Sequence, residues 1–195
     1  MLSVTDIYIL ILTGLAGVAV GSLIRMSRRR GRSDGMIVDG YVGELRQYVS
    51  SFGDFIMGNS IHIPYIYQKA VDQHGVSELR EATSTPLEEV RTLYLQLAER
   101  VRNLGQPASY VDFIELLGEF NTLVHVYHRV CVIRPARWIF PLVSEKGSTV
   151  LLSEFMMLRE KYQRWIDDFS SYLKRVNDSL GTLHFSNLFD PVPIP

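Results

Sequence analysis

Apolar residues return every three or four positions in four long stretches of the chain. These stretches cover residues 41–55, 87–104, 113–130 and 151–176. Steps that alternate between three and four residues place side chains on one face of an α-helix. Alternation of apolar and polar residues over the length of a strand is scarce. The pattern therefore predicts an all-α fold.

Residues that commonly begin and end helices flank the second stretch. Thr85 precedes Pro86 and lies three residues before Glu88. This arrangement is typical of an N-cap followed by a first-turn proline and a capping-box glutamate. Gly105 comes directly after the last apolar residue, and glycine often ends a helix. We therefore expect a helix that begins at Thr85 and ends before Gly105.

Similar signals mark the other helices. Ser109 is a candidate N-cap for the third stretch, and Pro135 is expected to end or kink the third helix. Gly181 is expected to close the last helix, which covers about Ser148–Leu180. A shorter helix is expected over Pro64–Gln73. Together these signals predict an antiparallel bundle of four long helices and one short helix.

The apolar face of the last helix consists of large aromatic side chains. A two-stranded coiled coil uses Leu, Ile and Val at these positions, so the aromatic face favours the core of an irregular bundle. At a rise of ~1.5 Å per residue the helix is about 50 Å long. Its far end is therefore a candidate to extend beyond the domain and pair with another copy or another protein. The aromatic members are Phe155, Tyr162, Trp165, Phe169 and Tyr172.

Near the start of the chain, Ile7–Ile24 contains no charged residue and leads directly into five arginines. At ~1.5 Å per residue this segment crosses most of a hydrocarbon core of about 30 Å. Asp6 precedes the segment and the positive charges follow it, which is the reverse of a secretory signal peptide. We expect an uncleaved, single-pass transmembrane anchor with the short N-terminus outside and the remainder cytoplasmic. The arginines, which would also attract anionic membrane lipids, are Arg25, Arg28, Arg29, Arg30 and Arg32.

Small residues on one side of this anchor suggest a packing face. Gly17 and Gly21 are four residues apart, and Gly14 lies close to the same face. Small residues at this spacing let two helix backbones approach closely in lipid. Glycine is also common in membrane helices that do not associate, so plain lipid exposure is the alternative.

Charge and cysteine content narrow the possible partners and compartments. The 195-residue chain has a formal net charge of −1 although a basic cluster follows the anchor, so the remainder is mildly acidic. This balance argues against nucleic-acid binding. A single cysteine excludes an intrachain disulfide and fits a reducing compartment. We divide the chain into an anchor (1–27), a basic flexible linker (28–39), a helical bundle (40–181) and an extended proline-rich tail (182–195).

One helix face carries the residues that best resemble a metal site. Asn121, His125 and His128 are spaced by four and three residues, and Cys131 is one step further. Imidazole and thiolate groups are good zinc ligands. However, no His-Glu-x-x-His, Glu-x-x-His or Cys-x-x-Cys motif supplies the remaining ligands. The alternative is a hydrogen-bonded polar patch at a helix contact, and we predict no cofactor.

The same helix carries an acidic row of Asp112, Glu115 and Glu119. Neighbouring carboxylates can act as acid and base or bind hard cations. A solvated face, or ion pairs with an arginine of a neighbouring helix, are the simpler interpretations.

Basic and aromatic residues alternate after this helix, around the apolar residues 130–133 and 138–140. Such a mixture suits a second contact with the membrane–water interface. An ordinary turn between core helices, with arginines that reach outward, is the alternative. The candidate patch consists of Arg134, Arg137, Trp138 and Phe140.

The last residues of the chain differ in character from the bundle. Prolines at every second position from Pro191 onward exclude a helix and favour an extended conformation. Phe185, Leu188 and Phe189 are apolar and need a surface to cover them. We therefore expect the tail to fold back over its own bundle, with docking into a partner's groove as the alternative.

We interpret the chain as a membrane-anchored helical adaptor or assembly subunit that contacts membrane lipids and either another protein or a second copy. The pattern Gly-x-Ser-x-Gly occurs once, at Gly31–Gly35, but it lies in the expected basic linker and does not follow a predicted strand, so it does not indicate a nucleophile elbow. No phosphate-binding loop is present. The alternatives are a small membrane-associated enzyme or metal-dependent effector that uses the Asn121, His125 and His128 face, or an oligomer that perturbs the bilayer.

Overall fold

The computed structural model describes residues 34–57, 63–74, 77–105, 107–145, 149–181, 185 and 188–194. Every regular element among these residues is a helix, which confirms the predicted fold class. The helices are α2 (Asp34–Ile56), α3 (Ile63–His74), α4 (Ser77–Arg102), α5 (Tyr110–Tyr127), α6 (Arg134–Glu145) and α7 (Thr149–Leu180). A π-helical turn, η1 (His128–Ile133), joins α5 to α6 without a break.

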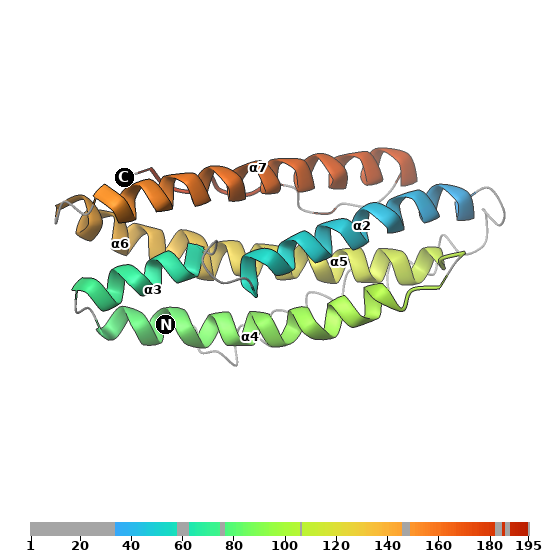
Figure 1. Ribbon diagram of the computed structural model, residues 1–195. Helices are drawn as coiled ribbons and strands as arrows, with labels where there is room; N and C mark the ends of the chain where they lie inside the picture. Colours follow the sequence, from blue (N-terminus) through green and yellow to red (C-terminus); the bar gives the residue numbers. More distant parts are fainter. Residues whose placement is uncertain are drawn as a thin grey trace.

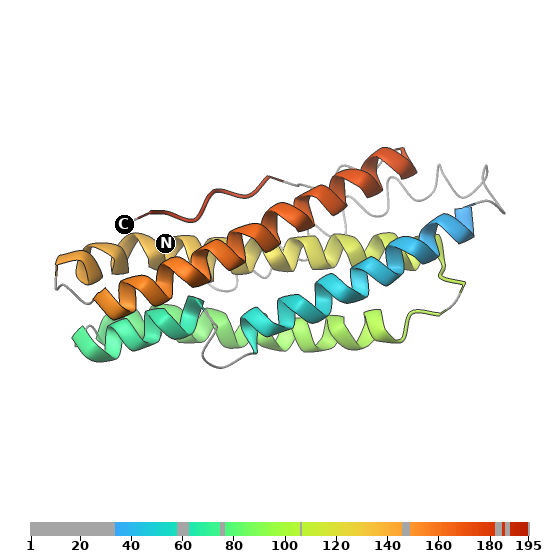
Figure 2. The ribbon, with the colours of Figure 1, turned by 45° about the horizontal axis from the view of Figure 1, so that its top comes forward.

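The helices form four long rows that lie side by side (Figure 1). The short helix α3 continues the row of α2, and the other rows are α4, the continuous α5–η1–α6 and α7 (Figures 1 and 2). Neighbouring rows along the chain run in opposite directions, as the colours in Figure 1 show. With α5–η1–α6 counted as one continuous segment, the described part is a bundle of five helical segments, of which α3 is the short one.

Aromatic rings fill the centre of the bundle. The indole of Trp165 on α7 is 9% exposed, and its ring centroid lies 5.3 Å from that of Phe52 on α2 and 6.5 Å from that of Phe120 on α5. Tyr162 and Phe169 stack on the two sides of Trp165 along α7. The aromatic face predicted from the sequence of the last helix is thus the face that meets α2 and α5.

Two arginines hold the C-terminal ends of neighbouring helices. Arg91 of α4 donates through Nε to the Ile56 carbonyl at the end of α2, over 2.7 Å. Arg46 of α2 donates through Nη2 to the Leu104 carbonyl just beyond α4, also over 2.7 Å. The last carbonyls of a helix have no partner within it, so a guanidinium that reaches them satisfies acceptors that would otherwise lack a bond.

The predicted start of the second helix is wrong. α4 begins at Ser77 and runs through Pro86, so neither Thr85 nor Pro86 marks its first turn. Proline lacks the N–H that bonds to the preceding turn and is unfavourable inside a helix. α3 packs along the first half of α4 (Figure 1). Tertiary packing therefore extends this helix past a local capping signal.

The sequence predicted that Pro135 would either end or kink the third helix. It does not end the helix. The chain passes through η1 and continues into α6. The proline ring and its missing N–H disturb an α-helical turn, and a π turn accommodates the disturbance. Tyr67 of α3 donates its hydroxyl to the Val132 carbonyl within this turn, over 3.0 Å. A neighbouring helix therefore supplies one bond to the irregular segment.

The start of the bundle also differs from the prediction. α2 begins at Asp34, so residues 34–39, which the sequence assigned to a flexible linker, are helical. Asp39 accepts a hydrogen bond from the Ala108 amide before α5, over 2.8 Å. The early residues of α2 thus belong to the folded bundle.

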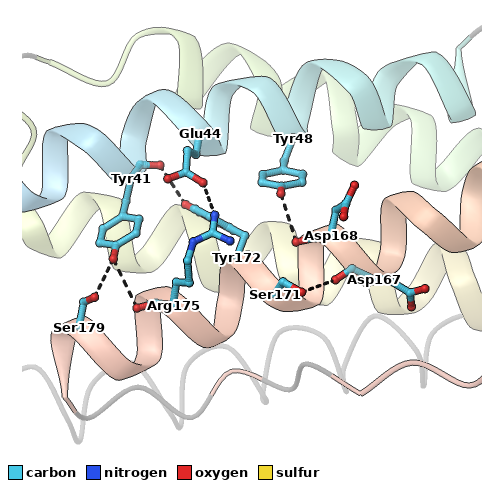
Figure 3. A network of polar contacts seen from close by, with 9 residues as sticks. All are labelled: Tyr41, Glu44, Tyr48, Asp167, Asp168, Ser171, Tyr172, Arg175 and Ser179. Carbon is cyan, nitrogen blue, oxygen red and sulfur yellow. Dashed lines mark hydrogen bonds and ion pairs between the residues drawn. The ribbon is translucent and has the colours of Figure 1, made fainter.

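The far end of α7 does not extend beyond the domain, because α2 covers it (Figure 3). Tyr41 bonds to the Ser179 hydroxyl at 2.6 Å, and the Tyr172 hydroxyl donates to the Tyr41 carbonyl at 2.9 Å. Arg175 pairs with Glu44 and lies over the Tyr172 ring. The network reaches Ser179, close to the end of α7. Just beyond that end, Gly181 adopts the left-handed conformation with φ 77°.

We predict opposite effects for two Gly→Ala substitutions in α2. A Cβ at buried Gly53 would lie 2.2 Å from the Tyr94 hydroxyl oxygen, whereas a Cβ at Gly43 meets no atom within 4 Å. Gly53→Ala should lower the free energy of unfolding by about 1–3 kcal/mol because Tyr94 must move. Gly43→Ala should raise it by up to about 1 kcal/mol, the helix-propensity gain. Urea denaturation followed by circular dichroism measures both, and equal effects would contradict the packing.

Candidate functional site: the groove that holds the C-terminal tail

The predicted anchor lies outside the described residues. So do its candidate packing residues Gly14, Gly17 and Gly21 and the five arginines from Arg25 to Arg32. Among the helices that are described, none is long and apolar enough to cross a bilayer.

The described tail residues cover a surface that α5, η1 and α7 form together, where they contact His125, His128, Arg159 and Gln163. Figure 2 shows the tail as an extended segment beside the bundle. We call this surface the tail groove and define its bundle side by Gly118, His125, His128, Arg159 and Gln163. The tail crosses it in one direction, from Phe185 near Gly118 to Val192 beside Arg159 and Gln163. The expectation that the tail folds back over its own bundle is thus confirmed for the described residues.

Phe189 is the aromatic anchor of the tail. Its ring stacks on the His125 imidazole, with centroids 4.0 Å apart and planes 11° from parallel. It also meets His128 edge to face, with centroids 5.5 Å apart. Stacked and edge-on aromatic pairs contribute beyond the apolar area that they bury. Both histidines therefore bind an aromatic side chain of the tail.

His128 also binds the main chain of the tail. Its Nε2 lies 2.6 Å from the Asp190 carbonyl oxygen. A carbonyl can only accept, so Nε2 carries the proton and Nδ1 is bare in the neutral ring. Nδ1 is buried and finds no partner among the described residues. Burial lowers the pKa of His128 below its ordinary value, because a second proton would place a charge in this enclosed position.

Val192 is the second anchor, and side chains of α7 bind both its amide and its carbonyl. Its side chain is 1% exposed. Its amide donates to Gln163 Oε1 over 3.2 Å, and its carbonyl accepts from Arg159 Nε over 3.0 Å. The tail thus forms three main-chain hydrogen bonds with bundle side chains when the bond from His128 is included.

The candidate metal residues have other roles. No group of three or more His, Cys, Asp or Glu side chains within the described ranges is arranged to hold a metal ion. His125 and His128 contact the tail, whereas Asn121 is buried with its Oδ1 unpartnered among those residues. Cys131 is buried, and burial raises the pKa of its thiol to about 12. The thiol is therefore protonated at neutral pH, which does not suit a nucleophile or a metal ligand.

Two members of the acidic row of α5 form ion pairs with an arginine of a neighbouring helix, which was one of the two simpler interpretations of the row. Arg100 of α4 reaches Glu115 at 2.9 Å and Glu119 at 2.5 Å, while Asp112 is exposed. Hydrogen bonds to these carboxylates raise the pKa of the Arg100 guanidinium. A shallow cavity of about 150 Å³ adjoins Arg100 between α4 and α5. Its lining contains no buried polar side chain that would orient a ligand.

The candidate interfacial patch is not a single surface. Arg134 and Arg137 are exposed, but Phe140 is 7% exposed and meets Phe155 edge to face with centroids 4.4 Å apart. The side chain of Trp138 lies outside the described part. Phe140 therefore belongs to the core and does not face a membrane, which corrects the prediction for this residue.

Arg159 and Gln163 were not identified from the sequence as functional residues. They are four residues apart on α7, beside the aromatic face. This spacing indicates that both side chains share a helix face. It does not reveal that the face borders a groove, because the ligand of that groove comes from a segment about 30 residues further along the chain.

Comparison of the chain with protein-family models, with curated proteins and with solved structures finds no match.

Proposed function

We propose that the protein is a single-pass membrane-anchored adaptor that acts through protein–protein contacts on the cytoplasmic face of the membrane. The observation that supports the contact role is the tail groove, in which bundle side chains hold an extended segment by its main chain and by two apolar anchors. Binding of extended segments in this way is a recurrent mode of peptide recognition.

The membrane part of the proposal is supported by the sequence. The uncharged segment Ile7–Ile24 has the length of a membrane span, and the arginines after it favour a cytoplasmic location for the bundle. An adaptor of this kind places its binding groove near the membrane surface.

Fractionation tests the anchor. The full chain is expected to stay in the membrane pellet after high-salt and carbonate washing, and a chain that lacks residues 1–33 is expected to leave it. A protease added to the outside of sealed cells should not remove an epitope at the C-terminus. Release by carbonate, or digestion of that epitope, would contradict the proposed anchor and topology.

The contact role requires a complex. In mild detergent the full chain is expected to elute as an assembly with a mass above that of the monomer in its micelle, measured by light scattering. A strictly monomeric particle at all concentrations, with no co-purifying protein, would count against an adaptor.

A further inference from the structure

The bundle recognises the tail mainly through groups that any extended peptide offers. The three hydrogen bonds use the Asp190 carbonyl, the Val192 amide and the Val192 carbonyl. The donors and acceptor on the bundle are the side chains of His128, Arg159 and Gln163. Main-chain bonds of this kind give affinity without fixing the sequence of the ligand.

Sequence preference comes from two side-chain positions three residues apart. Phe189 stacks on His125, and Val192 is 1% exposed. Pro191 between them is exposed and pre-sets the backbone, which lowers the entropy lost on docking. Neighbouring Leu188 and Ile194 are 84% and 68% exposed, so the groove does not select them. The pattern that fits is aromatic-x-Pro-aliphatic.

We propose that the tail groove is a docking site for an extended segment of a partner protein with the pattern aromatic-x-Pro-aliphatic, and that residues 188–194 are its intramolecular competitor. This inference deepens the proposed adaptor function, because it names the surface and the chemistry of the partner. The tail itself is the observation that identifies the chemistry, since it shows which side chains the groove accepts.

Competition sets the conditions for partner binding. A ligand tethered by a short link acts at an effective concentration in the millimolar range. A partner segment of similar intrinsic affinity therefore binds poorly from dilute solution. A partner confined to the same membrane surface has a higher local concentration and can displace the tail, which is how the anchor and the groove would act together.

The test uses the full chain in detergent and a fluorescent peptide with the sequence of residues 188–194. A groove-opened variant, Phe189→Ala/Val192→Ala, removes both anchors of the tail. A matched control, Leu188→Ala/Ile194→Ala, removes two apolar side chains that are exposed. We expect the groove-opened variant to bind the peptide at least about tenfold more tightly than the wild type or the control, because its own tail competes less.

The peptide has its own control, in which the Phe and Val positions are replaced by Ala. It should not bind the groove-opened variant. Absence of binding by the groove-opened variant, or equal binding of both peptides, would overturn the proposal. If wild-type chains instead dimerise through the tail groove as their concentration rises, the ligand that replaces the tail is another copy of this chain. That result would overturn the proposal of a separate partner protein.

A measurement on the wild type protects the test against a variant that fails to fold. Excess unlabelled peptide should displace the tail, so that the Val192 amide loses its protection from hydrogen exchange while amides in α5 and α7 keep theirs. Unchanged protection at saturating peptide would overturn the proposal. None of these outcomes alters the membrane fractionation, so failure of this inference and failure of the adaptor proposal are distinguishable.

Discussion

Trp165→Ala is expected to lower the free energy of unfolding by about 3–5 kcal/mol, the largest loss among single substitutions considered for this bundle. The indole is 9% exposed and lies where α7 meets α2 and α5. Removal of a large aromatic side chain loses its transfer free energy and leaves a cavity that the surrounding rings fill only in part. Urea denaturation followed by far-UV circular dichroism measures the loss.

Two further variants separate packing from hydrogen bonding at this position. The indole Nε1 donates to the Ser51 hydroxyl over 2.7 Å, and that hydroxyl donates to the Tyr48 carbonyl over 3.1 Å. Trp165→Phe keeps a ring but loses the donor, so it should cost less than Trp165→Ala. Ser51→Ala keeps the ring and leaves Nε1 without its acceptor, at a cost of about 1–3 kcal/mol. A loss below about 1 kcal/mol for Trp165→Ala would contradict a central role for this residue.

The helices were predictable because their evidence is local and repeated. The aromatic residues of α7 recur at helical spacing along the whole element, and the same residues form the core. The stop at Gly181 was predictable for a similar reason, since its positive φ suits glycine more than other residues. Periodicity and the terminal glycine therefore predicted the all-α fold and the end of the last helix.

The errors occurred where packing outweighs local preference. The Thr85–Glu88 signal is a genuine capping pattern, yet α3 packs beside this segment and α4 continues through it. Phe140 follows an arginine-rich segment and resembles an interfacial residue in sequence, but its contact with Phe155 on α7 buries it. Sequence patterns near one residue do not reveal which distant helix covers it.

The candidate site shows the same limit in another form. His125 and His128 were identified as chemically notable, and their spacing placed them on one face. Their ligand is a segment about 60 residues further along the chain, which binds by stacking and by a main-chain bond. The histidines were therefore found from the sequence, but their partner was not, because nothing local encodes the approach of the tail.

Acidification is expected to release the tail, with His128 as the sensor. In the docked state Nε2 donates to the Asp190 carbonyl and Nδ1 is buried without a partner among the described residues. Burial lowers the pKa of His128 in this state. A lowered pKa means that the undocked ring binds a proton more readily, so docking is strongest above the ordinary imidazole pKa of about 6.5 and weakens progressively as the pH falls below it.

The other groups around His128 modify this response without reversing it. His125, on the same helix, adds positive charge when protonated and further lowers the pKa of His128, whereas the Asp190 carboxylate of the tail raises it. Tyr162 of α7 stacks on the ring and stays neutral, because burial raises its pKa well above 10. Arg159 of α7 donates to the Val192 carbonyl of the same tail segment.

The protection factor of the Val192 amide measures docking directly, because this amide bonds to Gln163 in the tail groove. A protection factor divides out the intrinsic pH dependence of exchange, so a lower value at pH 5.5 than at pH 7.5 reports release of the tail. His128→Gln is the matched control, since its amide can donate to the Asp190 carbonyl but does not titrate. The variant should lose most of the pH dependence while amides of α7 remain protected. Equal loss of protection in the wild type and in His128→Gln would exclude His128 as the sensor.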